Sequence, residues 1–331
     1  MNAIDSARVL EGNRLALAKI ITLLESKQES HRAPAEKALT ELMPHSGNSV
    51  RIGISGPPGV GKSTFIEAIG LRLLDEGHKV AVLAVDPTSP LTGGSILGDK
   101  TRMDRLARDN RAFVRPSPSS GNLGGVTRHT REAIVACEAA GFDTIIVETV
   151  GVGQSEVVVA SMVDVFIALQ LPNAGDELQG IKKGILELAD VVVVNKADGN
   201  LMAAAKLAKA DLERAISLVR AEEKNPPKVL LSSSICNPEP TGFTEISREI
   251  ADFVARQKKS AGFAARRTAQ AVKWFRSELG EQLLERMERD PQFQSLVGKA
   301  ESSAAQGKVP GSIAARILVD HVFTSQVSAR E

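Results

Sequence analysis

The stretch RIGISGPPGVGKST, residues 51–64, runs from an apolar strand pattern through a glycine-rich loop into a helix pattern. Within it, Gly56-x-x-x-x-Gly61-Lys62-Ser63 has the spacing of a loop whose backbone N–H groups converge on phosphate oxygens. The helix N-terminus adds partial positive charge. Lys62 is expected to neutralise the β- and γ-phosphates, and the Ser63 hydroxyl to ligate Mg²⁺. A turn that only joined a strand to a helix would need neither residue. The residues expected to bind nucleotide here are Gly56, Pro57, Pro58, Gly59, Val60, Gly61, Lys62, Ser63 and Thr64.

Short apolar runs separated by helical patterns continue on the C-terminal side of this loop. Runs of Val, Ile and Leu without alternation are typical of strands buried on both faces, with the intervening helices as covers. The pattern predicts an α/β fold, a doubly wound and mostly parallel P-loop NTPase sheet with N- and C-terminal helical extensions. The expected strands are residues 51–54, 80–85, 112–114, 144–147, 163–169, 191–194 and 229–231.

Helical spacing dominates both ends of the chain. Leu17, Ile20, Ile21 and Leu24 recur at helical intervals, and a second amphipathic stretch follows Pro34. After about residue 246 the strand signals stop. We therefore expect an N-terminal helical extension over residues 1–47, a nucleotide-binding (G) domain over 48–246 and a C-terminal helical dimerisation arm over 247–331.

Bulk composition excludes several functions for this 331-residue chain. The formal net charge is +1, so no field of one sign attracts nucleic acid or an anionic membrane. Aromatic residues make up 3%, with no tyrosine, and the two cysteines, Cys137 and Cys236, are far apart. No apolar run reaches the roughly 18 residues of a spanning helix. Acidic residues near the N-terminus argue against a mitochondrial presequence. We expect a cytoplasmic protein with reduced thiols and no nucleic-acid or membrane partner.

The segment VVVVNKADG, residues 191–199, indicates which base is bound. Asp198 can accept hydrogen bonds from two guanine nitrogens, and the stem of Lys196 can lie along the ring. Two charge-assisted hydrogen bonds of about 1.5 to 3 kcal/mol each favour guanine over adenine by roughly two to four orders of magnitude. Asn195, Lys196 and Asp198 are therefore expected to bind the base of GTP or GDP. Ser233 and Ser234, at a later strand end, are weaker candidates to close over it.

Three acidic residues lie C-terminal to the phosphate loop, each next to an expected strand or loop: Asp86 in AVDPTSP, Asp99 in ILGDKTR and Glu148 in VETVG. Asp86 and Glu148 end buried strands at the expected nucleotide side of the sheet. Mg²⁺ takes only one or two direct protein ligands, so most of these acids would act through water. The expected metal-linked residues are Ser63, Asp86, Asp99 and Glu148, and those expected to serve catalysis are Lys62, Glu148, Asp86 and Asp99.

The motifs GPPGVGKST, VDPTSP, GDKTRM, SGNLGGVT, ETVGVGQSE, NAGDELQGIKKG and NKADG together resemble the methylmalonyl-CoA mutase-associated GTPases, the MeaB/ArgK/MMAA family. The resemblance spans about residues 13–330. It implies a homodimeric GTPase that acts as a chaperone for an adenosylcobalamin-dependent acyl-CoA mutase. Such a chaperone gates cofactor delivery and protects or reactivates the mutase. It also implies that NAGDELQGIKKG is a third switch, in which Asp176 and Lys182 are the preferred contacts.

The stretch ETVGVGQSE lacks a glutamine directly after Gly151, where one would normally orient the attacking water. Val152 takes that position and Gln154 lies three residues beyond Gly151. Arg102 is a candidate mobile cation for the γ-phosphate. A supplied arginine alone is worth roughly 10³ to 10⁵ in rate. We therefore expect slow hydrolysis in the free protein and faster hydrolysis once the mutase orders residues 147–156 and 175–184.

Proteins with three other functions can contain the same phosphate loop. A nickel-insertion GTPase would be expected to have a His-rich or Cys-containing tract, which five scattered histidines do not make. A small-molecule P-loop kinase would need a preference for ATP, against which Asp198 argues. A scaffold that binds GTP without turnover is harder to exclude.

Overall fold

The computed structural model describes residues 6–26, 28–85, 103–115, 123–149, 155–173, 183–223, 225–235 and 239–328. The chain divides into two compact units, Met1–Gln270 and Ala271–Glu331. The first contains the sheet and the expected nucleotide site. The division falls within a long helix rather than near residue 246, and the domain limits drawn from the sequence stay a prediction.

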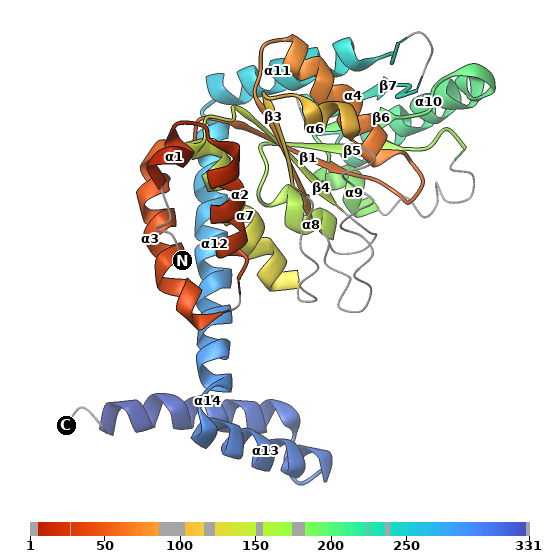
Figure 1. The fold of residues 1–331 in the computed structure, drawn as a ribbon. Coiled ribbons are helices and arrows are strands. Elements are labelled where there is room, and N and C mark those ends of the chain that lie inside the picture. The colour runs from red at the N-terminus through yellow and green to blue at the C-terminus, as the bar shows by residue number, and fades with distance from the viewer. Residues whose placement is uncertain are drawn as a thin grey trace. The chain divides into compact units, whose positions relative to one another are not determined.

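A seven-stranded parallel sheet forms the centre of the first unit (Figure 1). The strand order is β3-β2-β4-β1-β5-β6-β7, and every neighbouring pair is parallel. All seven strands expected from the apolar runs are present, within one or two residues of the expected limits. Their bounds are β1 Val50–Ser55, β2 Val80–Val85, β3 Ala112–Arg115, β4 Thr144–Thr149, β5 Val165–Gln170, β6 Val191–Val194 and β7 Lys228–Leu231.

Helices cover both faces of the sheet. On one face, Ile52 and Ile54 of β1 lie in a buried cluster with α4 (Lys62–Asp75), α6 (Asp104–Arg108) and α11 (Phe243–Lys259). On the other, the cluster includes residues of α7 (Leu123–Ala139), α8 (Ser155–Ala160), α9 (Lys183–Leu188) and α10 (Met202–Val219). Side chains alternate between faces along a strand, which is why both faces of these continuous apolar strands are buried.

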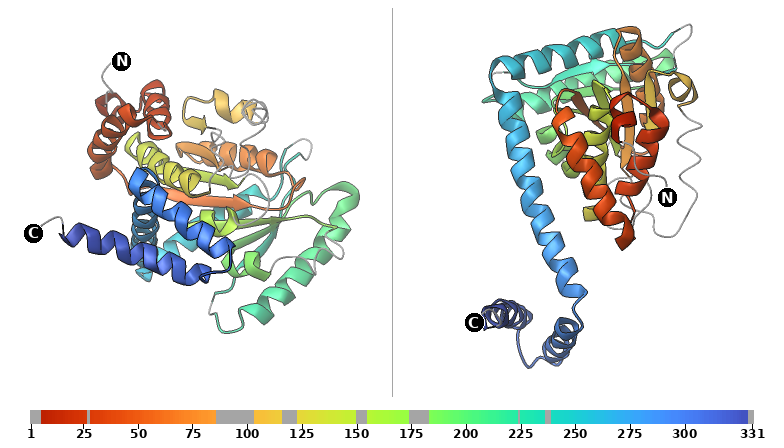
Figure 2. Two further views of the ribbon diagram at one scale, coloured as in Figure 1. Left: turned by 90° about the horizontal axis from the view of Figure 1, so that it is seen from below. Right: turned by 60° about the vertical axis from the view of Figure 1, so that its left-hand side comes forward.

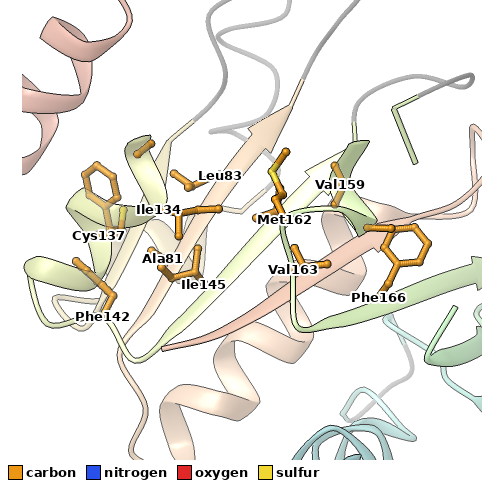
Figure 3. Packing of buried hydrophobic residues seen from close by; sticks show 14 of the residues in the cluster. Ala81, Leu83, Ile134, Cys137, Phe142, Ile145, Val159, Met162, Val163 and Phe166 are labelled. Atoms are coloured by element: carbon orange, nitrogen blue, oxygen red, sulfur yellow. The ribbon is translucent and has the colours of Figure 1, made fainter. Parts of the chain in front are cut away.

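Figure 3 shows part of the second cluster, where Cys137 of α7 packs beside Phe142 and Ile134. Burial raises the pKa of the Cys137 thiol well above its ordinary value, so the group is an unreactive apolar filler. Farther along the same cluster, Val159, Met162 and Val163 follow the chain from α8 to β5. These residues pack the helix in which the ETVGVGQSE motif ends against the sheet.

The N-terminal helices α1 (Ser6–Leu10), α2 (Arg14–Leu24) and α3 (Glu29–Leu42) lie against α7 (Figure 2). A short 3₁₀ turn, η1 (Met43–His45), leads into β1. Pro34 lies inside α3 rather than between two helices, and the break comes earlier, after α2. Leu17, Ile20, Ile21 and Leu24 are buried, as the helical spacing predicts.

Only helices follow β7 among the described residues: α11, α12 (Gly262–Glu288), α13 (Pro291–Ala305) and α14 (Gly311–Ser328). In the second unit, α13 packs on α14. The first turns of α12 belong to the first unit and are bonded to the loops that enter β5 and β6. Arg267 pairs with Asp164, and Arg266 with Asp190. Across the described ranges no helix combines the length and apolarity needed to cross a membrane.

Candidate nucleotide-binding site

The phosphate loop joins β1 to α4, as the sequence predicts. Gly61 lies at the N-cap of α4 with a φ of 91°, a left-handed conformation that favours glycine. Lys62 begins the helix, and its Nζ donates hydrogen bonds to the carbonyl oxygens of Gly56 (2.8 Å) and Pro57 (3.3 Å). Burial lowers the pKa of Lys62, while the nearby carboxylates of Glu148 and Glu156 act to raise it. The lysine is thus partly desolvated and lies across the loop where phosphates are expected.

Ser63 and Glu148 meet beside the loop. Glu148 belongs to β4, is only 3% exposed, and its Oε1 accepts a 3.4 Å hydrogen bond from the Ser63 hydroxyl. β4 is the neighbour of β1 in the parallel sheet, so both side chains lie at its carboxyl edge. A hydroxyl and a carboxylate are the hard oxygen ligands that Mg²⁺ prefers. The pair therefore fits the metal position expected from the sequence.

Within the described residues, no group of three His, Cys, Asp or Glu side chains lies close enough to hold a metal. A site with one or two protein ligands, completed by phosphate oxygens and water, is the usual arrangement for Mg²⁺ bound with a nucleotide. The other two acids expected here, Asp86 and Asp99, lie outside the described residues.

Asn195 connects three loops of the site. Its Nδ2 donates a 2.9 Å hydrogen bond to the carbonyl oxygen of Val60 in the phosphate loop. Its Oδ1 accepts from the hydroxyls of Ser232 (3.1 Å) and Ser234 (3.0 Å), which follow β7. Because Asn195 is 1% exposed, these bonds form where water cannot replace them. Its amide thus binds protein groups here and holds the base and phosphate loops together.

Asp198 is held by the remaining serine of the same loop, Ser233. The Ser233 hydroxyl donates to Oδ2 of Asp198, and Ser233 forms an isolated antiparallel bridge with Thr241. Lys196 has a φ of 58°, an unusual conformation for a residue other than glycine, which turns the chain sharply between Asn195 and Asp198. Such strain is common at ligand sites. The structure therefore brings together all five residues that the sequence predicts around the base.

Two residues of this region are not among those that the sequence predicts. Ser232 bonds Asn195, whereas the sequence motifs point to its neighbours Ser233 and Ser234; the run of three serines at residues 232–234 is the signal that includes it. Glu156 is 6% exposed in the first turn of α8 and acts electrostatically on Lys62. In the sequence, Glu156 is marked by its position at the end of ETVGVGQSE.

The remaining switch candidates fall outside the described residues. They are Arg102, Gly151, Gln154, Asp176 and Lys182.

Comparisons of the chain with family models, curated proteins and solved structures agree on one family. The family model described as methylmalonyl Co-A mutase-associated GTPase MeaB matches residues 17–292. A probable GTPase of Mycobacterium tuberculosis is 50% identical over 315 residues, covering 93% of this chain and 91% of that protein. GTPase ArgK of Escherichia coli is 48% identical over 287 residues and covers 86% of each chain.

The similarity extends to an animal protein and to a solved structure. The mitochondrial methylmalonic aciduria type A homolog of Mus musculus is 43% identical over 322 residues, covering 94% of this chain and 77% of that protein. A crystal structure described as a LAO/AO transport system kinase has a TM-score of 0.76 at 36% identity, covering 97% of this chain and 99% of that one. With its phosphate loop and guanine-type motif, the chain therefore belongs to the family of methylmalonyl-CoA mutase-associated GTPases and is a P-loop enzyme that hydrolyses GTP.

Proposed function

We propose that this GTPase regulates an adenosylcobalamin-dependent acyl-CoA mutase, with methylmalonyl-CoA mutase as the first candidate. It gates delivery of the cofactor to the mutase and protects or reactivates the mutase. The main support is the extent of the family match, which covers residues 17–292 and so includes most of α2, all of α3 and α11–α12 as well as the GTP site. A partner function needs such surfaces in addition to a nucleotide site. We place this activity in the cytoplasm, in agreement with the buried free thiol of Cys137.

The site residues have separate roles in this proposal. The phosphate-loop backbone and Lys62 bind the phosphates, and Asp198, oriented by Ser233, reads guanine. Ser63 and Glu148, together with Asp86 and Asp99, hold Mg²⁺ directly or through water. When bound, the metal neutralises charge on the β- and γ-phosphates. The chain's own contribution is to fix these groups before the nucleotide arrives, because Asn195 links the loops at the base and the phosphates.

Hydrolysis is proposed to be slow until the mutase binds. The water-orienting position after Gly151 is a valine, and stimulation comes from ordering residues 147–156 and 175–184. The helices α8 and α9, which begin at the ends of these segments, both pack on the sheet, so a partner at the segments acts next to a rigid core. Because the free protein hydrolyses GTP slowly, its bound nucleotide can signal whether the mutase has received its cofactor.

A homodimer is the proposed working form. Within the second unit, α12 has a row of exposed apolar side chains at helical spacing, namely Val272, Phe275, Leu279 and Leu283. Phe275 is 66% exposed. Such a stripe is typical of a helix that packs on another helix, and a second copy of this chain is the partner that the family resemblance implies.

The test is an affinity capture from the native cell, carried out with GDP and with a non-hydrolysable GTP analogue. We expect an acyl-CoA mutase to be recovered in a nucleotide-dependent manner and to accelerate GTP hydrolysis when purified. Lys62→Ala should lose tight GTP binding and nucleotide-dependent capture, whereas Lys206→Ala, an exposed lysine of α10, should keep both. Recovery of a hydrogenase or urease precursor would favour nickel insertion, and equal turnover with and without the mutase would refute the regulatory proposal.

A further inference from the structure

Two hydroxyl side chains meet where β1 and β4 end. Thr149 is the last residue of β4 and Ser55 the last of β1, and the Thr149 hydroxyl donates a 2.9 Å hydrogen bond to Oγ of Ser55. Both side chains are fully buried. Thr149 directly follows Glu148, and Ser55 directly precedes Gly56, the first residue of the phosphate loop. The bond therefore joins the strand that carries the acid of the site to the strand that enters the loop.

Packing alone does not explain a pair of hydroxyls at this position. Because side chains alternate along a strand, Thr149 is on the face of β4 that buries Ile145 and Val147 in an apolar cluster. Valine has nearly the shape of threonine and would fill the same space without a polar group that needs a partner. The pair therefore has a role other than filling space.

The bond extends the connection between the two strands beyond their backbone ladder. That ladder runs from the pair Val50 and Thr144 to the pair Ile54 and Glu148. The hydroxyl bond lies one residue farther along, where β1 turns into the phosphate loop. The ends of an element open more readily than its middle. A link at this point therefore limits how far the backbone of Glu148 can move away from the loop.

Glu148 is consequently held from both faces of the sheet. Its side chain is on the face opposite Thr149, where Oε1 accepts a hydrogen bond from the Ser63 hydroxyl of α4 at 3.4 Å. On the other face, Thr149 fixes the adjoining backbone to β1. The entry to the loop is also fixed on its far side, because a Cβ on Gly56 would lie 2.7 Å from the carbonyl oxygen of Leu169 in β5. A shift of the end of β4 alone would thus change the separation of Ser63 and Glu148.

We propose that Thr149 is a positioning residue for the bound cation and favours Mg²⁺ over larger divalent cations. Its bond to Ser55 sets the separation of the Glu148 carboxylate and the Ser63 hydroxyl. Mg²⁺ demands near-ideal octahedral geometry, whereas Ca²⁺ accepts more oxygen ligands in a flexible arrangement at longer distances. A fixed separation therefore matters more for Mg²⁺ than for Ca²⁺. The inference rests on the metal-linked role of Glu148 proposed above and does not depend on the mutase.

The experiment measures metal binding to the full chain in complex with GDP. Mg²⁺ and Ca²⁺ are titrated separately, and each is followed by its effect on the rate at which a fluorescent GDP dissociates. In Thr149→Val, which removes the hydroxyl at nearly constant shape, we expect Mg²⁺ affinity to fall by about fivefold, the factor for one hydrogen bond of ordinary strength. Ca²⁺ affinity should change by less than about twofold. Thr149→Ser keeps a hydroxyl and should restore Mg²⁺ affinity to within about twofold of the wild-type value.

The matched control is Thr144→Val. Thr144 is also buried in β4, but it lies at the opposite end of the strand, where its hydroxyl donates to Asp143. The length of the strand separates it from Thr149, about 17 Å. The affinities of this variant for Mg²⁺ and Ca²⁺ should equal those of the wild type.

Equal losses of Mg²⁺ and Ca²⁺ affinity in Thr149→Val, or no rescue by Thr149→Ser, would assign the bond a purely structural role and overturn the proposal. Glu148→Gln distinguishes this failure from failure of the metal site. If Glu148→Gln weakens Mg²⁺ binding and Thr149→Val does not, the positioning role is wrong and the metal site stands. If neither variant weakens Mg²⁺ binding, Glu148 is not metal-linked and both proposals are wrong.

A second variant keeps the test decisive if Thr149→Val does not fold. The double variant Ser55→Ala with Thr149→Val removes both partners of the bond, which costs little stability because no buried hydroxyl loses its partner. The same loss of Mg²⁺ affinity relative to Ca²⁺ is expected. An unchanged ratio of the two affinities in the double variant refutes the inference.

Discussion

Gly242 supports the base-binding loop in a way that a single methyl group should disrupt. It lies at the N-cap of α11 with a φ of 86°, and a Cβ there would lie 2.1 Å from the carbonyl oxygen of Leu231 and 3.1 Å from Cα of Ser232. Ser232 begins the serine run whose hydroxyls bond Asn195 and Asp198. In Gly242→Ala, the backbone at residues 231–232 must therefore move.

The expected loss of stability has two parts. A left-handed conformation costs an L-residue about 1 to 2 kcal/mol. Forcing a methyl group into a filled space costs about 1 to 3 kcal/mol more. Gly242→Ala should thus lower the free energy of unfolding by about 2 to 5 kcal/mol. Gly77→Ala is the matched control, because Gly77 has a φ of 93° but nothing within 4 Å of the added Cβ, so only the first part applies.

The assay is urea unfolding of both variants, combined with titration of a GTP analogue. We expect Gly242→Ala to bind the analogue about five- to thirtyfold more weakly, since misplacing the serines loosens one or two hydrogen bonds worth about 1 kcal/mol each. Gly77→Ala should bind as the wild type does. Equal losses of stability in the two variants, or unchanged affinity in Gly242→Ala, would refute the argument from the Leu231 contact.

Three further predictions concern charged groups. Asp198→Asn should weaken GTP binding by roughly two to four orders of magnitude and improve binding of xanthosine triphosphate; unchanged GTP affinity would contradict the guanine assignment. Arg267→Met leaves Asp164, whose side chain is 1% exposed, without its main partner, and should cost about 3 to 5 kcal/mol in denaturant unfolding, with partial recovery when Asp164→Asn is added. Burial by itself would raise the pKa of Glu138, but hydrogen bonds from Arg51 and its neighbours outweigh burial and lower it from 4.5. Its stabilising contribution is therefore complete above pH 4.5 and is lost as the pH falls through the folded-state pKa, so Glu138→Gln should flatten the acid limb of a stability–pH curve; an unchanged limb would show that other acids determine it.

The strands were predictable from the chain because burial on both faces leaves continuous runs of Val, Ile and Leu. The first and last residues of the strands were less predictable. The run 163–169 suggested a strand from Val163, but β5 begins at Val165. Asp164 is in the turn because its carboxylate accepts from the backbone of Arg51 and from the side chain of Arg267. Those partners are about 100 residues away in sequence and leave no local signal.

By itself, the sequence determined the phosphate loop, the guanine motif and the class of fold, because each depends on residues close together in the chain or on a local periodicity. The tertiary structure alone decided that Asn195 binds both Val60 and the serines after β7. It likewise decided that Glu156 lies near Lys62. Periodicity tells which side chains are buried but not which strands are neighbours. The order of the parallel strands determines which loops meet at the carboxyl edge, and that order is set by packing across the whole sheet.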